Sequence, residues 1–386
     1  MKNYSSTEPL YLDHNSTTPV DALVLEQMLP WFSRHFGNAS SSLHAFGWRA
    51  AEAVKIAREQ TAALIGAEPG EIYFTSGATE SLNLAIKGLF ETSAAERRQI
   101  LSYPTEHRAV LDTLRYLEKK GAEIIMAGVN EQGLPDTEAL RKAIGRQTLA
   151  VVAMLANNET GVLFPAGEIG AIAREAGAVY ICDATQACGK VHVNVQEIQA
   201  DLLALSAHKF YGPKGIGALF VRRKNPRIRL NPQVHGGGHE NRIRSGTLNV
   251  PGIVGLGAAA ELAAKGPGRY LSVQAERNAL ENFLLQSGAV VNGSGAHVLP
   301  NTINFRFPGL DAARLIAALP ELALSNGSAC SSASGEPSHV LLAMGLDPEA
   351  CRQSIRISLG RDADIAETKY ISGKISDALR KLSMQG

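Results

Sequence analysis

Lys209 has the sequence surroundings of a lysine that does covalent chemistry. It follows the apolar run Leu202–Leu205 and precedes the glycine-rich turn Phe210–Gly217. Burial disfavours the charged form of an amine, and a neutral amine can condense with an aldehyde as a Schiff base. Asp183 follows a second apolar run, where its carboxylate could pair with a pyridinium nitrogen. A lysine for the aldehyde and an aspartate for the ring nitrogen indicate pyridoxal phosphate.

Each of these two residues also has a plainer interpretation. Most lysines are solvated surface groups, and an aspartate after a strand commonly caps or turns the chain. For either residue alone the plainer interpretation is favoured. The pair in this order, with Ser206 and His208 close to Lys209, favours the cofactor site.

The segment Thr75–Ser81 follows one predicted strand and opens a predicted helix. Gly77 permits a sharp turn, and the amides and hydroxyls at the start of the helix can hold a phosphate. The alternative is an ordinary helix cap made by Ser76 or Thr79. Ligands of such sheets gather at the carboxyl ends of the strands, where this segment and Lys209 both fall, so a phosphate site is favoured.

Three more residues fall in or after predicted strands, and each is a weak signal alone. His107 could stack on a cofactor ring or pass protons, or it could be a plain loop residue. Asn158 could reach a ring hydroxyl, or it could make an Asx turn. Arg356 alternates with apolar residues, which suits an inward guanidinium that binds a carboxylate through two hydrogen bonds, although a lone strand arginine is usually at the surface.

Cys330 lies in the segment 325–338, whose small polar residues predict a mobile loop. An exposed thiol there could attack as a thiolate if a neighbour removed its proton, and the alternative is an unreactive surface cysteine. The four cysteines include no CxxC pair and show no regular spacing, so a disulfide framework or a zinc site is not expected.

Two other motifs are misleading. His235 and His239 flank three glycines, which make a poor scaffold for metal ligands. Gly255 and Gly257 match part of a dinucleotide fingerprint, but Pro251 is badly placed for the strand that should precede it, so a close-packed helix is the better interpretation.

The composition of the 386-residue chain is that of an ordinary globular protein, with a formal net charge of +1. This balance gives no sign of a nucleic-acid-binding face or of a surface made for anionic lipid. The first nine residues are polar and unlike a signal peptide, and no segment has the apolar length of a membrane span. We expect a cytoplasmic enzyme.

The order of apolar runs predicts an α/β fold with two domains. Short β-branched runs alternate with amphipathic stretches between residues 64 and 221, the pattern of a mostly parallel sheet. We predict a large domain over 16–260. Residues 1–15 and 261–386 would form a smaller α+β domain that carries the loop 325–338.

Taken together, these residues resemble the pyridoxal-phosphate-dependent cysteine desulfurases of the iron-sulfur cluster assembly and nitrogen-fixation types. The resemblance runs nearly end to end, through Tyr11–Pro19, Phe36–Asn38 with His44, Ser76–Glu80, Thr105–His107, Asn157–Glu159, Asp183–Gln186, Ser206–Lys209, Arg244–Thr247 and Gly327–Cys330. It implies a fold-type I transferase, an aminotransferase-like homodimer with a sheet of the seven-stranded type and the cofactor between the large and small domains.

The resemblance also implies roles for site residues. Lys209 would bind the cofactor aldehyde, Asp183 would pair with the pyridine nitrogen, and His107 would stack on the ring. Asn158 and Gln186 would contact the ring oxygen. The phosphate would be held by Ala78, Thr79, Ser206 and His208, with Thr247 of the partner subunit. Arg356 and Asn15 would bind the substrate carboxylate.

The implied reaction converts L-cysteine to L-alanine, with Lys209 and His107 as catalytic residues and the sulfur passing to Cys330 as a persulfide. The length of the Cys330 loop resembles the branch that serves iron-sulfur scaffolds, and no metal is expected beyond a transient cluster contact at Cys330. Thiolated RNA and modified DNA are other destinations for the sulfur. The alternatives are a transaminase, a selenocysteine lyase, or a sulfur carrier that keeps the cofactor without turnover.

Overall fold

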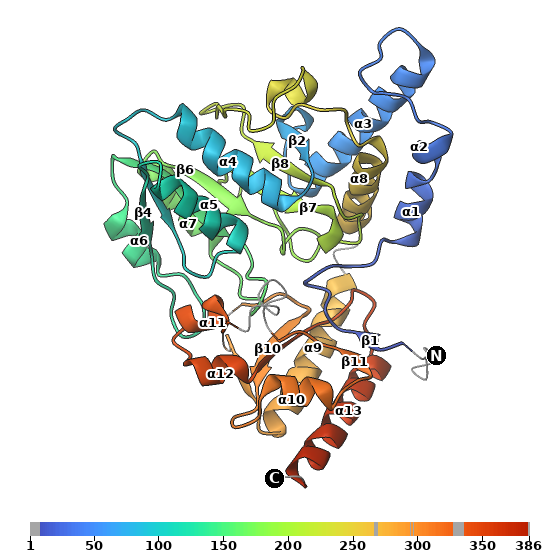
Figure 1. The fold of residues 1–386 in the computed structure, drawn as a ribbon, viewed down its shortest axis with the longest axis vertical. Helices are drawn as coiled ribbons and strands as arrows, with labels where there is room; N and C mark the ends of the chain where they lie inside the picture. Colours follow the sequence, from blue (N-terminus) through green and yellow to red (C-terminus); the bar gives the residue numbers. More distant parts are fainter. Residues whose placement is uncertain (1–7, 266–268, 294, 296, 327–335, 385–386) are drawn as a thin grey trace.

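The structure is a computed structural model that describes residues 8–384 except 266–268, 294, 296 and 327–335. Its main element is a seven-stranded sheet in the order β2-β8-β7-β6-β5-β3-β4 (Figure 1). The strands are β2 Ile72–Thr75, β3 Gln99–Ser102, β4 Glu123–Met126, β5 Thr148–Met154, β6 Val179–Asp183, β7 Leu202–Ser206 and β8 Gly217–Val221. Only β8 runs antiparallel to its neighbours, so the predicted mostly parallel sheet is confirmed.

Alternate residues of the central strands pack against helices on opposite faces of the sheet. Tyr180 and Cys182 belong to the core formed with α3 (Ala45–Leu64), α7 (Ala166–Glu175) and α8 (Val250–Lys265). Ile181 belongs instead to the core formed with α4 (Ala78–Thr92) and α5 (Arg108–Glu118). This two-sided burial explains why the central strands read as continuous apolar runs.

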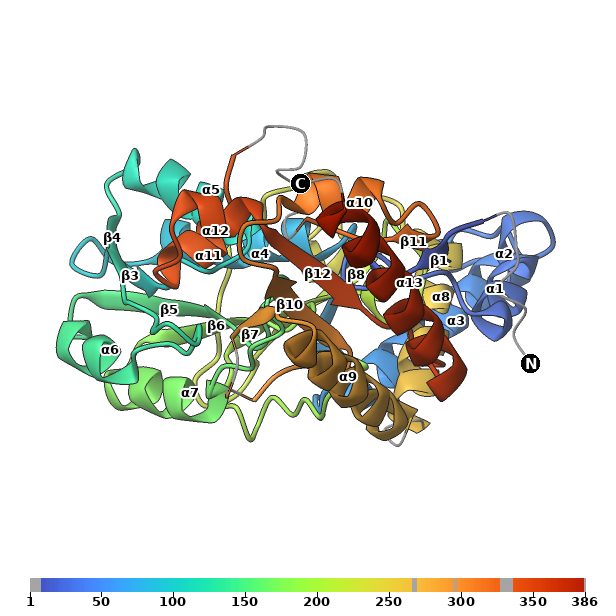
Figure 2. The same cartoon turned by 90° about the horizontal axis from the view of Figure 1, so that it is seen from below.

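A third core surrounds a smaller antiparallel sheet in the order β12-β10-β9. Its strands are β9 Val290–Asn292, β10 Thr302–Arg306 and β12 Ser354–Ser358, and helices α9 (Arg269–Gln286) and α13 (Ile365–Ser383) pack together beside it (Figure 2). Near the N-terminus, β1 (Leu10–Tyr11) pairs with β11 (Leu322–Ala323), and Leu12 is part of this core. The N-terminal segment and the last third of the chain therefore pack together.

The remaining helices are short. They are α1 Ala22–Met28, α2 Pro30–Ser33, α6 Thr137–Ala143, α10 Ala312–Ala317, α11 His339–Ala343 and α12 Pro348–Arg352, with the 3-10 turns η1 Pro69–Glu71, η2 Ala207–Lys209 and η3 His239–Arg242. Over the residues described, the structure has no helix long and apolar enough to cross a lipid bilayer.

The division into two domains remains a prediction. Helix α8 runs past the predicted boundary at residue 260 to Lys265, and Leu262 and Ala263 still pack against the core of the larger sheet. We propose that the large domain includes all of α8.

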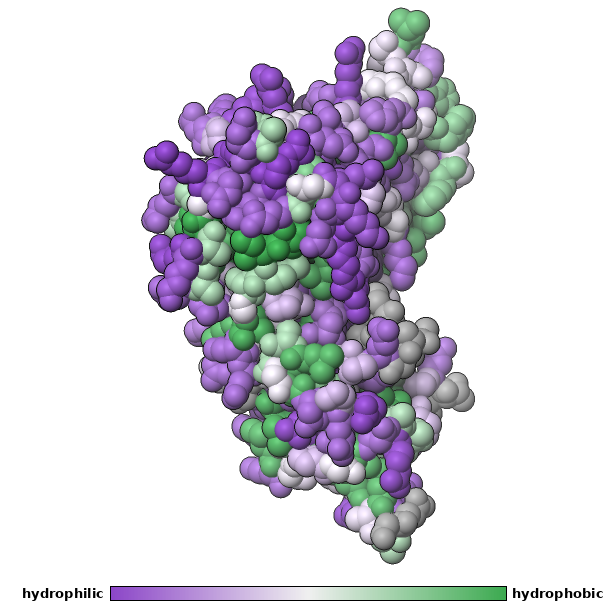
Figure 3. Space-filling view, turned by 60° about the vertical axis from the view of Figure 1, so that its left-hand side comes forward, coloured by the Kyte–Doolittle hydropathy of each residue, from purple (hydrophilic) through white to green (hydrophobic). Residues whose placement is uncertain are grey.

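Apolar side chains are exposed on the arm formed by α1, α2 and the start of α3, at the upper right of Figure 3. They are Leu23, Leu25, Leu29, Phe32, Phe36, Leu43, Phe46 and Trp48. Exposed apolar side chains gathered on one part of a protein are typical of protein-protein contact surfaces.

We predict that Gly217→Ala destabilises the protein, because the strand start packs directly on the turn at Gly77. A Cβ atom at residue 217 would lie 2.5 Å from the Leu205 carbonyl oxygen and 2.7 Å from the Cα atom of Gly77. Overpacking against main chain should lower the free energy of unfolding by about 1–3 kcal/mol, which denaturant titration would measure.

Gly373→Ala is the matched control, because no atom of the described residues lies within 4 Å of its added Cβ atom in helix α13. That variant should be as stable as the original protein, or more stable by roughly 0.5–1 kcal/mol. An unchanged free energy of unfolding for Gly217→Ala would contradict the close packing of these two turns.

Candidate active site

A cavity of about 540 Å³ lies at the carboxyl ends of the central strands. Its walls come from the large sheet, from the N-terminal segment and from strand β12. The predicted site residues that line it are Asn15, Ala78, Thr79, His107, Asn158, Asp183, Gln186, Ser206, His208, Lys209 and Arg356. Residues far apart in the chain thus meet in one space of a size that suits a small cofactor and its substrate.

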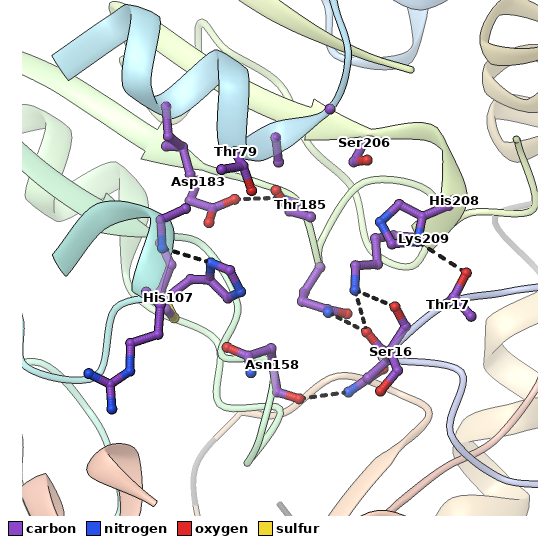
Figure 4. A pocket seen from close by; sticks show the side chains of 18 of the residues that line it. Ser16, Thr17, Thr79, His107, Asn158, Asp183, Thr185, Ser206, His208 and Lys209 are labelled. Carbon is purple, nitrogen blue, oxygen red and sulfur yellow. Dashed lines mark hydrogen bonds between the residues drawn. The ribbon is translucent and has the colours of Figure 1, made fainter. Parts of the chain in front are cut away.

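The Lys209 side chain points into this cavity from the turn that follows β7 (Figure 4). Its Nζ atom donates hydrogen bonds to the main-chain oxygens of Asn15 and Ser16, each at 2.7 Å. The N-terminal segment therefore passes the cavity at the Lys209 amine and holds that amine in place.

The start of helix α4 has the features of an anion site. Gly77, with φ 153°, occupies the capping position that precedes the helix, and glycine has no side chain to cap it. Among the described residues no side-chain hydrogen bond caps this helix, so Ser76 and Thr79 do not act as the ordinary cap considered above. A Cβ atom at Gly77 would lie 3.6 Å from the Ser206 hydroxyl, so that hydroxyl lies beside the helix start. The uncapped amides of a helix start, a nearby hydroxyl and the positive end of the helix dipole suit a phosphate.

His208 adds a neutral imidazole to this end of the cavity. Burial lowers the pKa of His208 to about 4, and the positive charges of Lys209 and Lys214 lower it in the same direction. Its Nδ1 atom is 3.1 Å from the Thr17 hydroxyl (Figure 4). At neutral pH this side chain is therefore a hydrogen-bonding group and not a second cation.

Asp183 and His107 line the opposite part of the cavity. Asp183 is buried at the end of β6, and its Oδ1 atom accepts a hydrogen bond from the Thr185 amide at 2.9 Å. The His107 Nδ1 atom accepts from the Ala109 amide at 3.1 Å and caps helix α5. In the neutral imidazole this contact leaves the ring proton on Nε2.

Arg356 lies on β12 with only 2% of its surface exposed. Its guanidinium donates to the Asn158 carbonyl oxygen at 2.7 Å, to the Ser16 hydroxyl at 2.9 Å and to Asp13. The Nε atom is a buried donor without a hydrogen-bond partner among the described residues. An unsatisfied cationic donor beside a cavity is suited to an anionic ligand such as a carboxylate.

Asn15 is less open to a ligand than the sequence predicts. Its Nδ2 atom donates to Asn158 O at 3.3 Å and to Thr302 Oγ1 at 2.9 Å, and its Oδ1 atom accepts from Lys190 at 2.8 Å. Both hydrogens of the amide are thus directed to protein oxygens. Binding of the substrate carboxylate by Asn15 stays a prediction.

One predicted residue that the structure describes is not brought into the cavity, and a second falls outside the described residues. Thr247 is exposed and does not line the cavity of its own chain, so its predicted role through the partner subunit stays a prediction. Cys330 lies outside the described residues. The described residues that flank its segment do reach the site, since Ser325 pairs with Arg356 and the Ser338 hydroxyl donates to Glu159 at 2.5 Å.

Glu159 and Lys190 are functional candidates that the sequence did not reveal. Glu159 lines the cavity, and burial raises the pKa of its carboxyl group to about 7 even though the Ser338 hydroxyl and the Arg356 charge oppose the rise. Lys190 is buried behind Gln186 and Asn15. Neither has a local signal beyond its place near a motif, because the burial of both depends on segments distant in the chain.

Comparison with known proteins shows what the chain is similar to. Residues 10–371 match the family model described as Aminotransferase class-V. A protein named cysteine desulfurase IscS from Anaeromyxobacter sp. (strain Fw109-5) is 49% identical over 378 residues, which cover 97% of this chain and 93% of that protein. The protein of the same name from Neisseria meningitidis serogroup C / serotype 2a is 48% identical over 379 residues, with the same coverage of both chains.

Solved structures also superpose on most of the chain. A structure titled NifS-like protein superposes with a TM-score of 0.90 at 35% identity, over 96% of this chain and 99% of that one. The structure titled SspA in complex with cysteine superposes with a TM-score of 0.81 at 37% identity, over 90% of this chain and 98% of that one.

We predict that Glu159 makes the protein less stable as the pH rises from about 4.5 to 7. In this range the unfolded chain has released the Glu159 proton and the folded chain still holds it, so unfolding becomes more favourable with rising pH. Glu159→Gln keeps an acceptor for Ser338 but cannot ionise. Between pH 4.5 and 7.5 the original protein should lose roughly 3 kcal/mol of unfolding free energy relative to this variant. Denaturant unfolding at each pH would measure the free energy of unfolding of both proteins. If this free energy changed with pH in the same way for the original protein and for Glu159→Gln, a buried, protonated Glu159 would be contradicted.

Proposed function

The chain belongs to the class-V aminotransferase family, whose members use pyridoxal phosphate, and from this membership we propose that it is a cysteine desulfurase. Relatives that carry this name match it along 97% of its length at 48–49% identity. The substrate is L-cysteine, and the products are L-alanine and a persulfide on Cys330. Overall, L-cysteine and the Cys330 thiol give L-alanine and the Cys330 persulfide, so atoms and electrons balance.

The single observation that carries this proposal is the meeting of Lys209 and Arg356 at one short segment. The Lys209 amine donates to the main-chain oxygens of Asn15 and Ser16, and the Arg356 guanidinium donates to the Ser16 side chain. An amine that can bind an aldehyde cofactor therefore lies close to a buried cation that can bind an amino-acid carboxylate. A reaction on a free amino acid needs both groups at one place.

The donor set of the cavity fits pyridoxal phosphate. Lys209 would hold its aldehyde, Asp183 its pyridine nitrogen, and Asn158 and Gln186 its ring oxygen, with His107 stacked on the ring. Ala78, Thr79, Ser206 and His208 would hold the phosphate at the uncapped start of helix α4, together with Thr247 of the partner subunit. When bound, this cofactor takes up the electrons left when an amino acid loses its Cα proton.

The residues of the chain perform the remaining tasks. Arg356 binds and orients the substrate carboxylate, and Lys209 moves the proton at Cα. The Asp183 carboxylate keeps the ring nitrogen protonated. The Cys330 thiolate attacks the substrate sulfur, so that an S–S bond forms as the C–S bond breaks. The described residues at both ends of the Cys330 segment contact Arg356 and Glu159, which is consistent with such an approach.

The proposed partners are a second copy of the chain and a sulfur acceptor. The exposed apolar residues of the α1–α3 arm offer a surface for the homodimer, which would also supply Thr247 to the site. The acceptor is an iron-sulfur scaffold or a sulfur-carrier protein, and any cluster contact at Cys330 would be transient.

Lys209→Ala should abolish both cofactor attachment and catalysis. Without the amine, protein incubated with pyridoxal phosphate should lack the visible absorbance of a lysine-bound cofactor. Alanine production from cysteine should fall by at least 10³-fold, since the same amine moves the Cα proton. Absorbance spectra and amino-acid analysis would measure the two effects. Lys142→Ala, at an exposed helix position, is the control and should behave as the original protein. Full alanine production by Lys209→Ala would overturn the proposal.

Cys330→Ser should separate cofactor binding from sulfur transfer. Its visible absorbance should be unchanged because the thiol does not hold the cofactor, whereas protein-bound persulfide and alanine should be lost. Mass spectrometry of the protein after incubation with cysteine would detect the added sulfur. Normal alanine production by this variant would instead favour a lyase that does not use the thiol, and an original protein that binds the cofactor but makes no alanine would favour a carrier without turnover.

A further inference from the structure

Lys190 is a buried amine that the proposed chemistry leaves without a role. Only 5% of its surface is exposed. Its Nζ atom donates to Asn15 Oδ1 and to Gln186 Oε1, each at 2.8 Å. Among the residues that the structure describes, no carboxylate forms an ion pair with it. Burial lowers the pKa of the Lys190 amine well below its ordinary value, and the positive charges of Lys209 and Arg356 lower it further.

Burying a lysine without an anionic partner is costly, so its hydrogen bonds are the feature to explain. Each of its two contacts needs one N–H bond on the lysine and one oxygen on the partner. An ammonium has three N–H bonds and a neutral amine has two, so both contacts persist when Lys190 loses its charge. The ammonium form has no acceptor and therefore selects the oxygen side of both amides. The neutral amine still has enough N–H bonds for both of the contacts that the structure shows.

This selection fixes which way each amide points. A side-chain amide has an accepting oxygen and a donating NH₂ group of nearly the same size, and only its partners decide its orientation. With Oδ1 of Asn15 on Lys190, Nδ2 is turned to Asn158 O and Thr302 Oγ1. With Oε1 of Gln186 on Lys190, Nε2 is turned to the main-chain oxygen of Asn15, at 2.8 Å.

The Gln186 amide faces the part of the cavity where the Lys209 amine lies. The Asn15 carbonyl oxygen that accepts from Gln186 Nε2 also accepts from Lys209 Nζ, so the two donors lie side by side. An NH₂ group has two hydrogens, and only one of those on Gln186 is needed for this contact. Gln186 lines the cavity, so its second hydrogen is available to an acceptor on a bound ligand.

We propose that Lys190 is a positioning residue that sets the polarity of the amides at the cofactor site. By holding the Gln186 oxygen behind the cavity wall, it presents the Gln186 NH₂ group to the cavity as a donor for the ring oxygen of the cofactor. The inference rests on the proposed pyridoxal phosphate site. A donor at this position stabilises the negative charge on that oxygen.

The test compares Lys190→Met, Gln186→Met and the double variant in full-length protein. Lys190→Met has a similar length but no N–H bond on its side chain, so the Gln186 oxygen loses its donor and only the hydrogen bond from Nε2 to the Asn15 carbonyl oxygen still opposes a turn of the amide. Two quantities are measured for each protein: the affinity for pyridoxal phosphate, and the pH midpoint of the visible absorbance of the bound cofactor. Lys142→Met is the control for the same change at an exposed lysine.

We expect Lys190→Met to weaken cofactor binding by about tenfold and to raise the pH midpoint by about one unit, because the form with more negative charge on the ring oxygen loses its donor. Gln186→Met should do the same. The double variant should show little more than either single change, because Lys190 acts through Gln186. A purely structural lysine would lower the melting temperature of the cofactor-free protein and leave the midpoint in place, which would overturn the inference. Additive shifts would overturn it too.

Gln186→Met carries the test alone if Lys190→Met cannot be obtained folded. This variant keeps the contact between Lys190 and Asn15, and an unchanged midpoint would show that Gln186 supplies no donor to the ring oxygen. Failure of the original protein to bind pyridoxal phosphate would contradict the proposed function itself. Normal binding by the original protein, with no effect in any variant, would contradict the roles of Lys190 and Gln186 and leave the proposed reaction standing.

Discussion

The main-chain carbonyl of Asn15 is the contact on which the site depends. It accepts hydrogen bonds from the Lys209 amine and from the Gln186 amide, so a segment near the N-terminus joins two residues at strand ends of the large sheet. One residue further on, Ser16 binds both Lys209 and Arg356. Because main-chain oxygens have fixed positions once β1 is paired with β11, they hold the long side chains of Lys209 and Gln186 in one arrangement. Order of this kind lowers the entropic cost of bringing reacting groups together.

Burial gives the site an unusual set of protonation states. Burial raises the pKa of Glu159 to about 7 and raises that of Glu106 well above its usual range, and it lowers the pKa values of Lys190 and His208. Burial therefore favours the neutral forms of these groups. With fewer charged groups around the cavity, a bound cofactor, the substrate carboxylate and their direct partners would be the dominant charges. The low dielectric of the buried site would make the interactions between them strong.

The sequence predicted the parts of the site that follow apolar strands. Lys209, Asp183 and the Thr75–Ser81 turn each come directly after such a run, and parallel strands bring their carboxyl ends to one edge, so local pattern and sheet topology were enough. Lys190 and Glu159 have no such mark. Lys190 is buried by contact with Asn15, 175 positions away, and Glu159 by contact with Ser338, 179 positions away. Helix α3 was not predicted either, because its small residues pack against α8 from a distant part of the chain.

The account depends most on Lys209 as the residue that holds pyridoxal phosphate, and peptide mapping tests this directly. The purified protein would be incubated with the cofactor, reduced with borohydride to make the attachment permanent, digested, and examined by mass spectrometry. The account predicts that the modified lysine is Lys209. Modification at Lys190, the buried amine that also contacts Asn15, or no modified lysine in the cavity, would contradict it.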